Sequence, residues 1–339
     1  MRIKTLIFIL TAAGSMLAQS TAHYKITQSY PLGGDGSWDY IIPDTLEHRI
    51  YIARHNRLMV VDENSGKLIG EVTGINGAHG TAIVHKSGRG FATSGDDQSV
   101  VIFDLKTLKM TGRVAAADDA DAIVFDEVSN RVFTLNGDAH SSTVIDGMTG
   151  KLVRNISLGG KPEYGVSSGD GKVYANLVDT NEVVEIDSKS LTVTHRWSTA
   201  PCKQPVAMAI DMKNHRLFSG CRSGVIAISD YKSGKIITTL PIGVGVDGAG
   251  YDPGTHDAFA ANADGTLTVI HQDGPDQYRV VQNLATAVGS RNMGLDATKH
   301  RIYVASARFG TVLEGSKAKK PVLPGTFTLL RIEVDPSAQ

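Results

Sequence analysis

An all-β fold built from a repeated four-stranded unit is predicted by two sequence observations. First, an aromatic residue ends a short strand-like segment seven times, at intervals of 40 to 44 residues. These residues are Tyr51, Phe91, Phe133, Tyr174, Phe218, Phe259 and Tyr303. Second, a polar residue that opens a turn repeats in phase with them, as Asp62, Asp104, Asp146, Asp187, Asp230 and His271. Repeats of this length are typical of propeller blades, so we expect a seven-bladed β-propeller with four antiparallel strands per blade.

The composition agrees with one domain of this kind. The chain has 339 residues, 36 of them glycine, and its short apolar runs are rich in valine, isoleucine and threonine. These residue types favour strands and tight turns. No linker, charge block or shift in composition divides the chain, so we assign residues 23–339 to a single propeller domain.

The first unit shows which sequence segments we expect to form the four strands of a blade. We expect its innermost strand at 38–42, its second at 49–53, its third at 58–61 and its outer strand at 67–72. The turn that begins at Asp62 contains Asn, Ser and Gly, which suit a tight turn. We expect the aspartate to be structural, since its side chain can accept hydrogen bonds from the turn backbone.

The segments at the two ends of the chain together supply the four strands of one blade. The last unit has strand-like segments at 293–295, 301–305 and 327–334, and then the chain ends without an outer strand. Upstream of the first unit, 24–32 is an alternating segment without a blade of its own. Pairing it onto the last unit would remove two exposed strand edges, so we expect the N-terminal strand to close blade seven.

The first 22 residues resemble a secretory signal peptide. Arg2 and Lys4 give a basic start, 6–13 is almost wholly apolar, and Ala18 and Ala22 are candidate cleavage positions. The apolar stretch is too short to span a membrane, although an uncleaved anchor is the alternative. No cysteine lies near the cleavage positions, which argues against a lipid anchor. We therefore expect an exported protein, periplasmic or secreted, without a membrane anchor.

The charge of the chain bears on its partners, and its cysteines bear on a disulfide. The formal net charge is −1, and no basic run or stripe is present, so a nucleic-acid partner is not expected. The chain has two cysteines. Cys202 precedes the first strand of unit five and Cys221 ends its second strand, which places them side by side in an antiparallel pair. In an exported chain this predicts a disulfide between them.

The repeated phrase resembles a known family. In unit three it is Arg-Val-Phe at 131–133, Val-Ile-Asp at 144–146 and Thr-Gly-Lys at 149–151, and unit seven repeats the first part at 301–304. These segments resemble the YVTN-repeat, YncE-like β-propellers of exported bacterial proteins, over about residues 24–335. The literal YVTN string is absent. The wider superfamily includes lactonases and lyases, but none of their residue sets is recognisable here.

Candidate functional residues lie where each inner strand begins, twelve residues before each aromatic marker. This position is occupied, blade by blade, by Asp39, His79, Asp121, Pro162, Val206, Asp247 and Arg291. Five of the seven are ionisable, and they come from the neighbouring blades six, seven, one, two and three. We call these five residues the charged arc, and the central opening that they should face the mouth. Adjacent candidates for ligand binding are Trp38, Tyr40, Glu163 and Asn292.

Three interpretations of the charged arc are open. The charges can simply pair along a water-filled channel. They can form a ligand site for a small molecule, a protein or a peptide. They can also be catalytic, with His79 as general base and Arg291 stabilising negative charge. A divalent cation such as calcium, held by Asp39, Asp121, Asp247 or Glu163, could then polarise a carbonyl.

We expect a monomeric binding or interaction module that uses the polar mouth. The alternative is a hydrolase or lyase, lactonase-like and metal-assisted, acting on a small lactone, sugar or uronate at the same mouth. Blade seven also carries a long insertion at 308–325 on this face, with Lys317, Lys319 and Lys320. It is either a lid or a surface loop, and we favour a partial lid because basic residues would be attracted to an acidic mouth.

Overall fold

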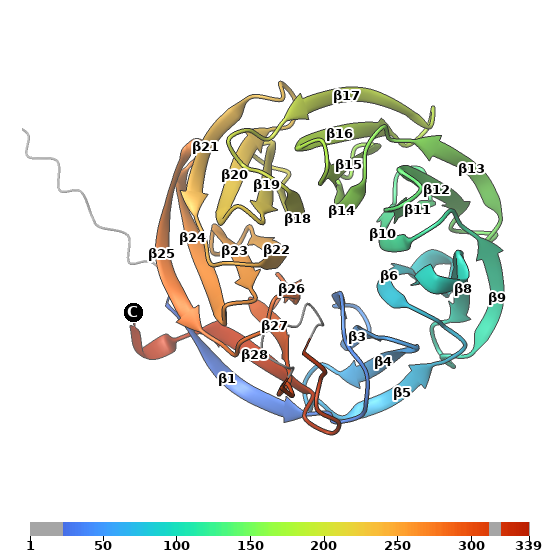
Figure 1. The fold of residues 1–339 in the computed structure, drawn as a ribbon, viewed down its shortest axis with the longest axis horizontal. Helices are drawn as coiled ribbons and strands as arrows, with labels where there is room; N and C mark the ends of the chain where they lie inside the picture. Colours follow the sequence, from blue (N-terminus) through green and yellow to red (C-terminus); the bar gives the residue numbers. More distant parts are fainter. Residues whose placement is uncertain (1–22, 312–319, 339) are drawn as a thin grey trace, which may run out of the picture.

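The protein is a seven-bladed β-propeller, as the sequence predicts (Figure 1). The computed structural model describes residues 23–311 and 320–338. Its strands form seven sheets of four antiparallel strands each, arranged in a ring around a central opening. The predicted signal peptide and its cleavage positions lie outside the described residues. No helix in the described ranges is long and apolar enough to cross a membrane.

In blades one to six the four strands follow the order of the chain from the centre of the ring outwards, and in blade seven β1 takes the outer place. The innermost strands are β2 (Ile41–Asp44), β6 (Ala78–Val84), β10 (Ala120–Asp126), β14 (Pro162–Ser167), β18 (Pro205–Asp211), β22 (Val246–Asp252) and β26 (Met293–Asp296). The second strands are β3 (Arg49–Arg54), β7 (Arg89–Ser94), β11 (Arg131–Asn136), β15 (Lys172–Leu177), β19 (Arg216–Cys221), β23 (Asp257–Asn262) and β27 (Arg301–Ser306).

The outer half of the blades follows the same scheme. The third strands are β4 (Arg57–Asp62), β8 (Ser99–Asp104), β12 (Ser141–Asp146), β16 (Glu182–Asp187), β20 (Val225–Asp230), β24 (Thr266–Gly274) and β28 (Thr328–Val334). The outer strands are β5 (Leu68–Val72), β9 (Met110–Ala115), β13 (Leu152–Ser157), β17 (Thr192–Ser198), β21 (Ile236–Pro241), β25 (Gln277–Ala285) and β1 (Tyr24–Pro31). Three short 3₁₀ helices are η1 (His85–Ser87), η2 (Gly95–Asp97) and η3 (Pro336–Ala338).

The repeated aromatic residues form the core between blades. All seven are fully buried, with an exposed fraction of 0%. Tyr51 of blade one, for example, packs against Phe103 of blade two with ring centroids 6.0 Å apart. One large apolar side chain per blade, placed at the same strand position, therefore fills each seam and accounts for the period of the sequence.

The repeated aspartates have the structural role expected of them. In blade one, Oδ1 of Asp62 accepts hydrogen bonds from the backbone and the hydroxyl of Ser65, at 2.8 and 2.7 Å. Asp146 accepts the same pair of bonds from Thr149 in blade three. These side chains close the turn between the third and outer strands, and they have no contact with the central opening.

The N-terminal strand closes the ring. β1 pairs antiparallel with β28, from Tyr24 opposite Val334 to Pro31 opposite Thr328. Figure 1 shows β1, in blue, beside the red β28 at the rim. The Tyr24 hydroxyl donates a hydrogen bond to Asp257 of blade six at 2.7 Å, and its ring packs edge-on against Phe259. The N-terminus therefore fastens blade seven to blade six as well.

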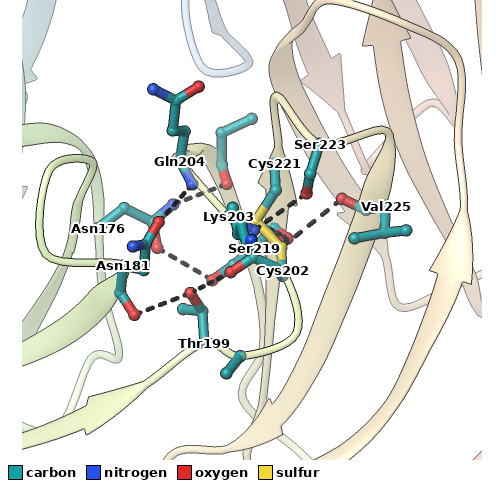
Figure 2. The surroundings of a disulfide bond; sticks show 12 residues. Asn176, Asn181, Thr199, Cys202, Lys203, Gln204, Ser219, Cys221, Ser223 and Val225 are labelled. Atoms are coloured by element: carbon teal, nitrogen blue, oxygen red, sulfur yellow. Dashed lines mark hydrogen bonds between the residues drawn. A yellow bond between two sulfur atoms is a disulfide. The ribbon is translucent and has the colours of Figure 1, made fainter.

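The predicted disulfide is present in blade five (Figure 2). The Cα atoms of Cys202 and Cys221 lie 5.8 Å apart, and both residues are fully buried. In the register of β18 and β19, Pro205 is opposite Cys221, so the segment that enters the inner strand passes beside the end of the second strand. Thr199 ties down this entry segment, because its hydroxyl donates to the Asn181 carbonyl at 3.0 Å.

Candidate functional site

A β-bulge at the start of most inner strands presents the candidate residues to the mouth. In β6 the register shifts between Ala78 and Thr81, so that His79 lies in the extra segment. The same shift occurs around Asp121 in β10 and at Asp247 in β22. A bulge turns a side chain away from the regular alternation of the strand. In blades two, three and six this bulge is the local reason why the side chain twelve residues before the aromatic marker departs from the strand alternation.

Three members of the charged arc converge on one point. His79 Nδ1 lies 2.7 Å from Oδ2 of Asp39 and 3.4 Å from Oδ1 of Asp121. One ligand atom from each of the three residues lies within 4.8 Å of the other two. The side chains are 30%, 21% and 16% exposed, respectively. We call these three residues the central triad.

Asn292 joins the central triad to the rest of the arc. It is buried, and its Nδ2 donates hydrogen bonds to Oδ1 of Asp39 at 3.1 Å and to Oδ2 of Asp247 at 3.2 Å. Asp247 also pairs with Nε of Arg291 at 3.0 Å. Asn292 therefore holds two carboxylates of neighbouring blades in position and does not itself face solvent. Asp247 pairs with Arg291 and lies outside the central triad.

The central triad changes the pKa of its own members. Burial lowers the pKa of His79, but the hydrogen bond to Asp39 and the charge of Asp121 outweigh it and raise that pKa to about 9. Burial also raises the pKa of Asp121, in spite of the charge on His79. At neutral pH the imidazole is therefore a cation that donates its hydrogen bond to Asp39.

Two further carboxyl groups at the mouth are affected by burial. Burial raises the pKa of Asp247 to about 6, and the charge of Arg291 offsets part of this effect. Burial likewise raises the pKa of Glu163, although Arg222 acts in the opposite direction. The cationic partners Arg291 and Arg222 therefore help to keep Asp247 and Glu163 ionised.

A pocket of about 700 Å³ lies beside the central triad, between blades seven and one. We call it the mouth pocket; its lining includes Trp38, Asp39, His79, Val288, Arg291, Phe309, Lys320 and Val322. One wall is therefore charged, and another is aromatic and aliphatic. Pockets of this volume with a few converging polar groups are typical of small-molecule sites.

The described ends of the blade-seven insertion form one wall of the mouth pocket. Phe309 and Val322 form an isolated antiparallel bridge, and the Leu323 amide donates to the Arg308 carbonyl at 2.8 Å. The Phe309 ring packs against Trp38, with centroids 6.0 Å apart. Lys320 lines the pocket, whereas the segment that carries Lys317 and Lys319 lies outside the described residues.

The side of the mouth near blades four and five is polar too, although the residues aligned at the start of their inner strands are not ionisable. Pro162 and Val206, the aligned residues of blades four and five, are buried. Glu163, one residue further on, pairs instead with Arg222 at 2.9 Å. Lys161 pairs with Asp119 at 3.3 Å. These residues line a second pocket of about 330 Å³ together with Asp121, Val178, Asp179 and Gln204.

Tyr40 supports the mouth from below. It is buried, its hydroxyl donates to the Glu163 carbonyl at 3.3 Å, and its ring packs edge-on against Tyr164. The structure also corrects one strand boundary, because β2 begins at Ile41 and not at Trp38. Asp39 and Tyr40 still exchange backbone hydrogen bonds with Ala53, so they continue the strand direction towards the mouth.

A buried arginine supports the loop at the rim of the mouth. Arg54 is fully buried at the end of β3, and its guanidinium donates to the carbonyls of Gly33, Asp35, Gly36 and Ser37. Burial lowers the pKa of Arg54 to about 10. The loop held in this way leads directly to Trp38 and Asp39. The sequence signal was available, since Arg54 is the only charged residue at this strand position among the seven blades.

Fold and site together define a repeat protein of the β-propeller class with a charged central mouth and one disulfide. The chain belongs to the family described as "Domain of unknown function (DUF5074)", which matches residues 40–237. We find no match among curated proteins. Many solved chains share the fold, among them a chain of "Crystal Structure of Mitotic Checkpoint Complex". It is 11% identical, with a TM-score of 0.72 over 98% of this chain and 99% of that chain, a likeness of fold alone.

Proposed function

We propose that the protein is a binding module that takes a small molecule with an apolar body and an anionic group at the mouth pocket. The observation that carries this proposal is the composition of that pocket. Trp38, Phe309 and Val288 offer apolar contact area on one side, and Arg291 and Lys320 offer positive charge on the other. A pocket with both characters suits a ligand with both characters.

Arg291 is the residue that we expect to contact the anionic group. Its side chain is 48% exposed, and its Nε is already paired with Asp247. Among the described residues, the two terminal guanidinium nitrogens of Arg291 have no hydrogen-bond acceptor. They are therefore free to donate to a carboxylate, sulfonate or phosphate in the fork geometry that arginine favours.

The rival function, a hydrolase or lyase with His79 as general base, has less support. The hydrogen bond between His79 and Asp39 resembles the one by which a carboxylate orients a general base. However, a pKa of about 9 keeps the imidazole protonated at neutral pH, where a general base must be neutral.

We also propose that the protein is exported and that it belongs among the YVTN-repeat propellers. The basic and apolar start of the chain supports a signal peptide over residues 1–22, and a disulfide is common in an oxidising compartment. The Arg-Val-Phe and Thr-Gly-Lys phrases support a place among the YVTN-repeat propellers. N-terminal sequencing of the protein from a periplasmic or medium fraction tests export: a mature chain that begins at Met1 would contradict it.

The binding proposal can be tested with an anilinonaphthalene sulfonate, a fluorescent probe with an apolar body and one anionic group. We expect saturable binding to the native protein. Arg291→Gln should weaken it by roughly 1–3 kcal/mol, the usual range for one lost charged contact. Val288→Asp should also weaken it, because Val288 is 71% exposed and the new carboxylate would enter the apolar wall without disturbing the core.

Arg279→Gln is the matched control. Arg279 is a half-exposed arginine on the outer strand β25, and its Nε is also paired with an aspartate, Asp273, at 2.9 Å. Its loss should leave probe binding unchanged. Equal affinity in wild type and in the Arg291 and Val288 variants would place the probe elsewhere and refute the proposed site. Native mass spectrometry of the purified protein would then identify any retained compound.

A further inference from the structure

The central triad has a charge imbalance that its neighbours do not share. Within the described ranges, Asp247 is paired with Arg291 and Glu163 with Arg222. Each of these two carboxylates has its own permanently charged partner. Asp39 and Asp121, in contrast, share the single imidazole of His79.

One atom of the central triad is left without a hydrogen bond. Oδ1 of Asp121 is buried, and no donor in the described part of the chain satisfies it. It lies 3.4 Å from His79 Nδ1, too far for a good hydrogen bond. A buried carboxylate oxygen without a donor is costly, and a bound water or ion is one way of satisfying it. This observation is independent of the charge imbalance and concerns the same point of the mouth.

We propose that His79, Asp39 and Asp121 bind a divalent transition-metal ion of the zinc type. The donor set is one imidazole nitrogen and two carboxylate oxygens, from three different blades, with ligand atoms within 4.8 Å of one another. Three protein ligands that leave a further coordination position open are typical of zinc sites that meet a ligand. The ligand atoms around such an ion lie about 3.3 Å apart, so His79 and Asp39 need to separate by only a few tenths of an ångström.

The donor set selects among cations. Calcium takes six to eight oxygen ligands, and magnesium prefers oxygen ligands and water in a strict octahedron. An imidazole ligand favours zinc and its neighbours in the first transition series. The inference therefore replaces the calcium considered from sequence with a softer ion, and it assigns no ligand role to Asp247 or Glu163.

The surroundings of the central triad fit a metal centre. Nδ2 of Asn292 donates to Oδ1 of Asp39 and leaves Oδ2 of that carboxylate turned towards His79. Hydrogen bonds of this kind orient the ligands of metal sites. Asp39 and His79 also line the mouth pocket, and Asp121 lines the second pocket. An ion could thus enter from the mouth, and its open position would face a bound molecule.

Metal uptake by the tag-free, folded chain tests the inference. After treatment with a chelator, the protein is titrated by calorimetry with zinc, manganese and calcium ions separately, and the bound metal is measured after dialysis. We expect one zinc ion per chain, no comparable uptake of calcium, and a rise in the melting temperature with zinc. Cobalt in place of zinc should give the visible absorption of a nitrogen- and oxygen-ligated ion.

Two conservative variants locate the site. Asp121→Asn and His79→Gln keep the shape of the side chains and should weaken zinc binding at least about tenfold, and remove the thermal shift. The control is His85→Gln, because His85 forms a similar pair with Asp44 at 2.9 Å but lacks a third ligand. This control variant should bind zinc as the wild type does.

Every outcome decides the question. A wild-type chain that takes up no zinc, or that prefers calcium, overturns the inference. So does a chain whose zinc affinity is unchanged in both triad variants, because the ion then lies elsewhere. The result is separate from the proposed function, since zinc uptake is measured without an organic ligand, and probe binding can fail while the metal site stands.

Discussion

The guanidinium carbon of Arg54 lies 3.8 Å from the centre of the Phe327 ring. Arg54 ends the second strand of blade one, and Phe327 precedes the third strand of blade seven, so the contact bridges the closing seam of the ring. Arginine over an aromatic ring is stabilising, more so when water is excluded. With its four carbonyl acceptors, this cation links the seam to the loop that leads to the mouth.

Arg54→Met should therefore destabilise the protein strongly. The variant keeps much of the side-chain volume but leaves four loop carbonyls without their donor, and hydrogen bonds to a charged group contribute about 1.5–3 kcal/mol each. We expect the free energy of unfolding to fall by about 3 kcal/mol, measured by urea denaturation. Arg279→Met, at an exposed pair, should cost less than about 1 kcal/mol. Similar losses in the two variants would contradict a special role for Arg54.

Removal of β1 should open the ring. Without residues 24–31, the edge of β28 loses its partner, and the Tyr24 contacts with Asp257 and Phe259 of blade six disappear. We expect a much lower melting temperature and self-association through the bared edge. Light scattering after size exclusion measures both size and aggregation. A truncated protein as stable and monomeric as the full chain would refute the closure.

The disulfide should be complete in the folded protein and stabilise it. Titration of the denatured, unreduced protein should find no free thiol. Cys202 and Cys221 enclose a loop with a sequence separation of 19, and the chain-entropy account gives about 3 kcal/mol for a loop of that size. The double variant Cys202→Ala/Cys221→Ala should lose that amount. Two free thiols in the native preparation would count against the bond.

The turn aspartates should make part of the stability depend on acid pH. A backbone hydrogen bond from the residue three positions later lowers the pKa of Asp104, Asp146 and Asp187. Their folded pKa lies below the unfolded value, so the stability they contribute is present above about pH 4 and is lost as pH falls below it. The triple Asp→Asn variant keeps the acceptor but not the charge. It should lose less stability than wild type between pH 6 and pH 3, followed by urea midpoints; equal losses would exclude these carboxylates.

The fold could be predicted from the sequence because every blade repeats the same few interactions. Tyr51 and its six counterparts fill equivalent seams, and Asp62 and its counterparts close equivalent turns. The disulfide was also predictable, since antiparallel pairing brings Cys202 beside Cys221. A repeat shows what the blades have in common, which here is the aromatic residue of each seam and the polar residue of each turn.

The candidate site could be predicted only in part, because its details differ from blade to blade. Strand alignment found Asp39, His79 and Asp121, but it could not find Arg222, which reaches the mouth from the loop after β19. Nor could it show that Asn292 is a buried bridge, because its neighbours depend on the bulges in adjacent blades. Which charges pair is a matter of side-chain conformation, and the repeat does not encode it.

Asn292 leads to the last prediction. Its amide donates to both Asp39 and Asp247, so Asn292→Leu would leave Oδ1 of Asp39 without this donor, leave Oδ2 of Asp247 with Arg291 alone, and remove the group between two negative charges. We expect a loss of about 1–3 kcal/mol in the free energy of unfolding, the usual cost of unsatisfied buried acceptors. In the double variant Asn292→Leu/Asp247→Asn the repulsion is removed, and part of the loss should be recovered. Urea denaturation of the two single variants, the double variant and wild type gives the coupling energy. Strictly additive losses would show that Asn292 does not act through Asp247, and the amide would then be an ordinary buried side chain and not the link between the two carboxylates.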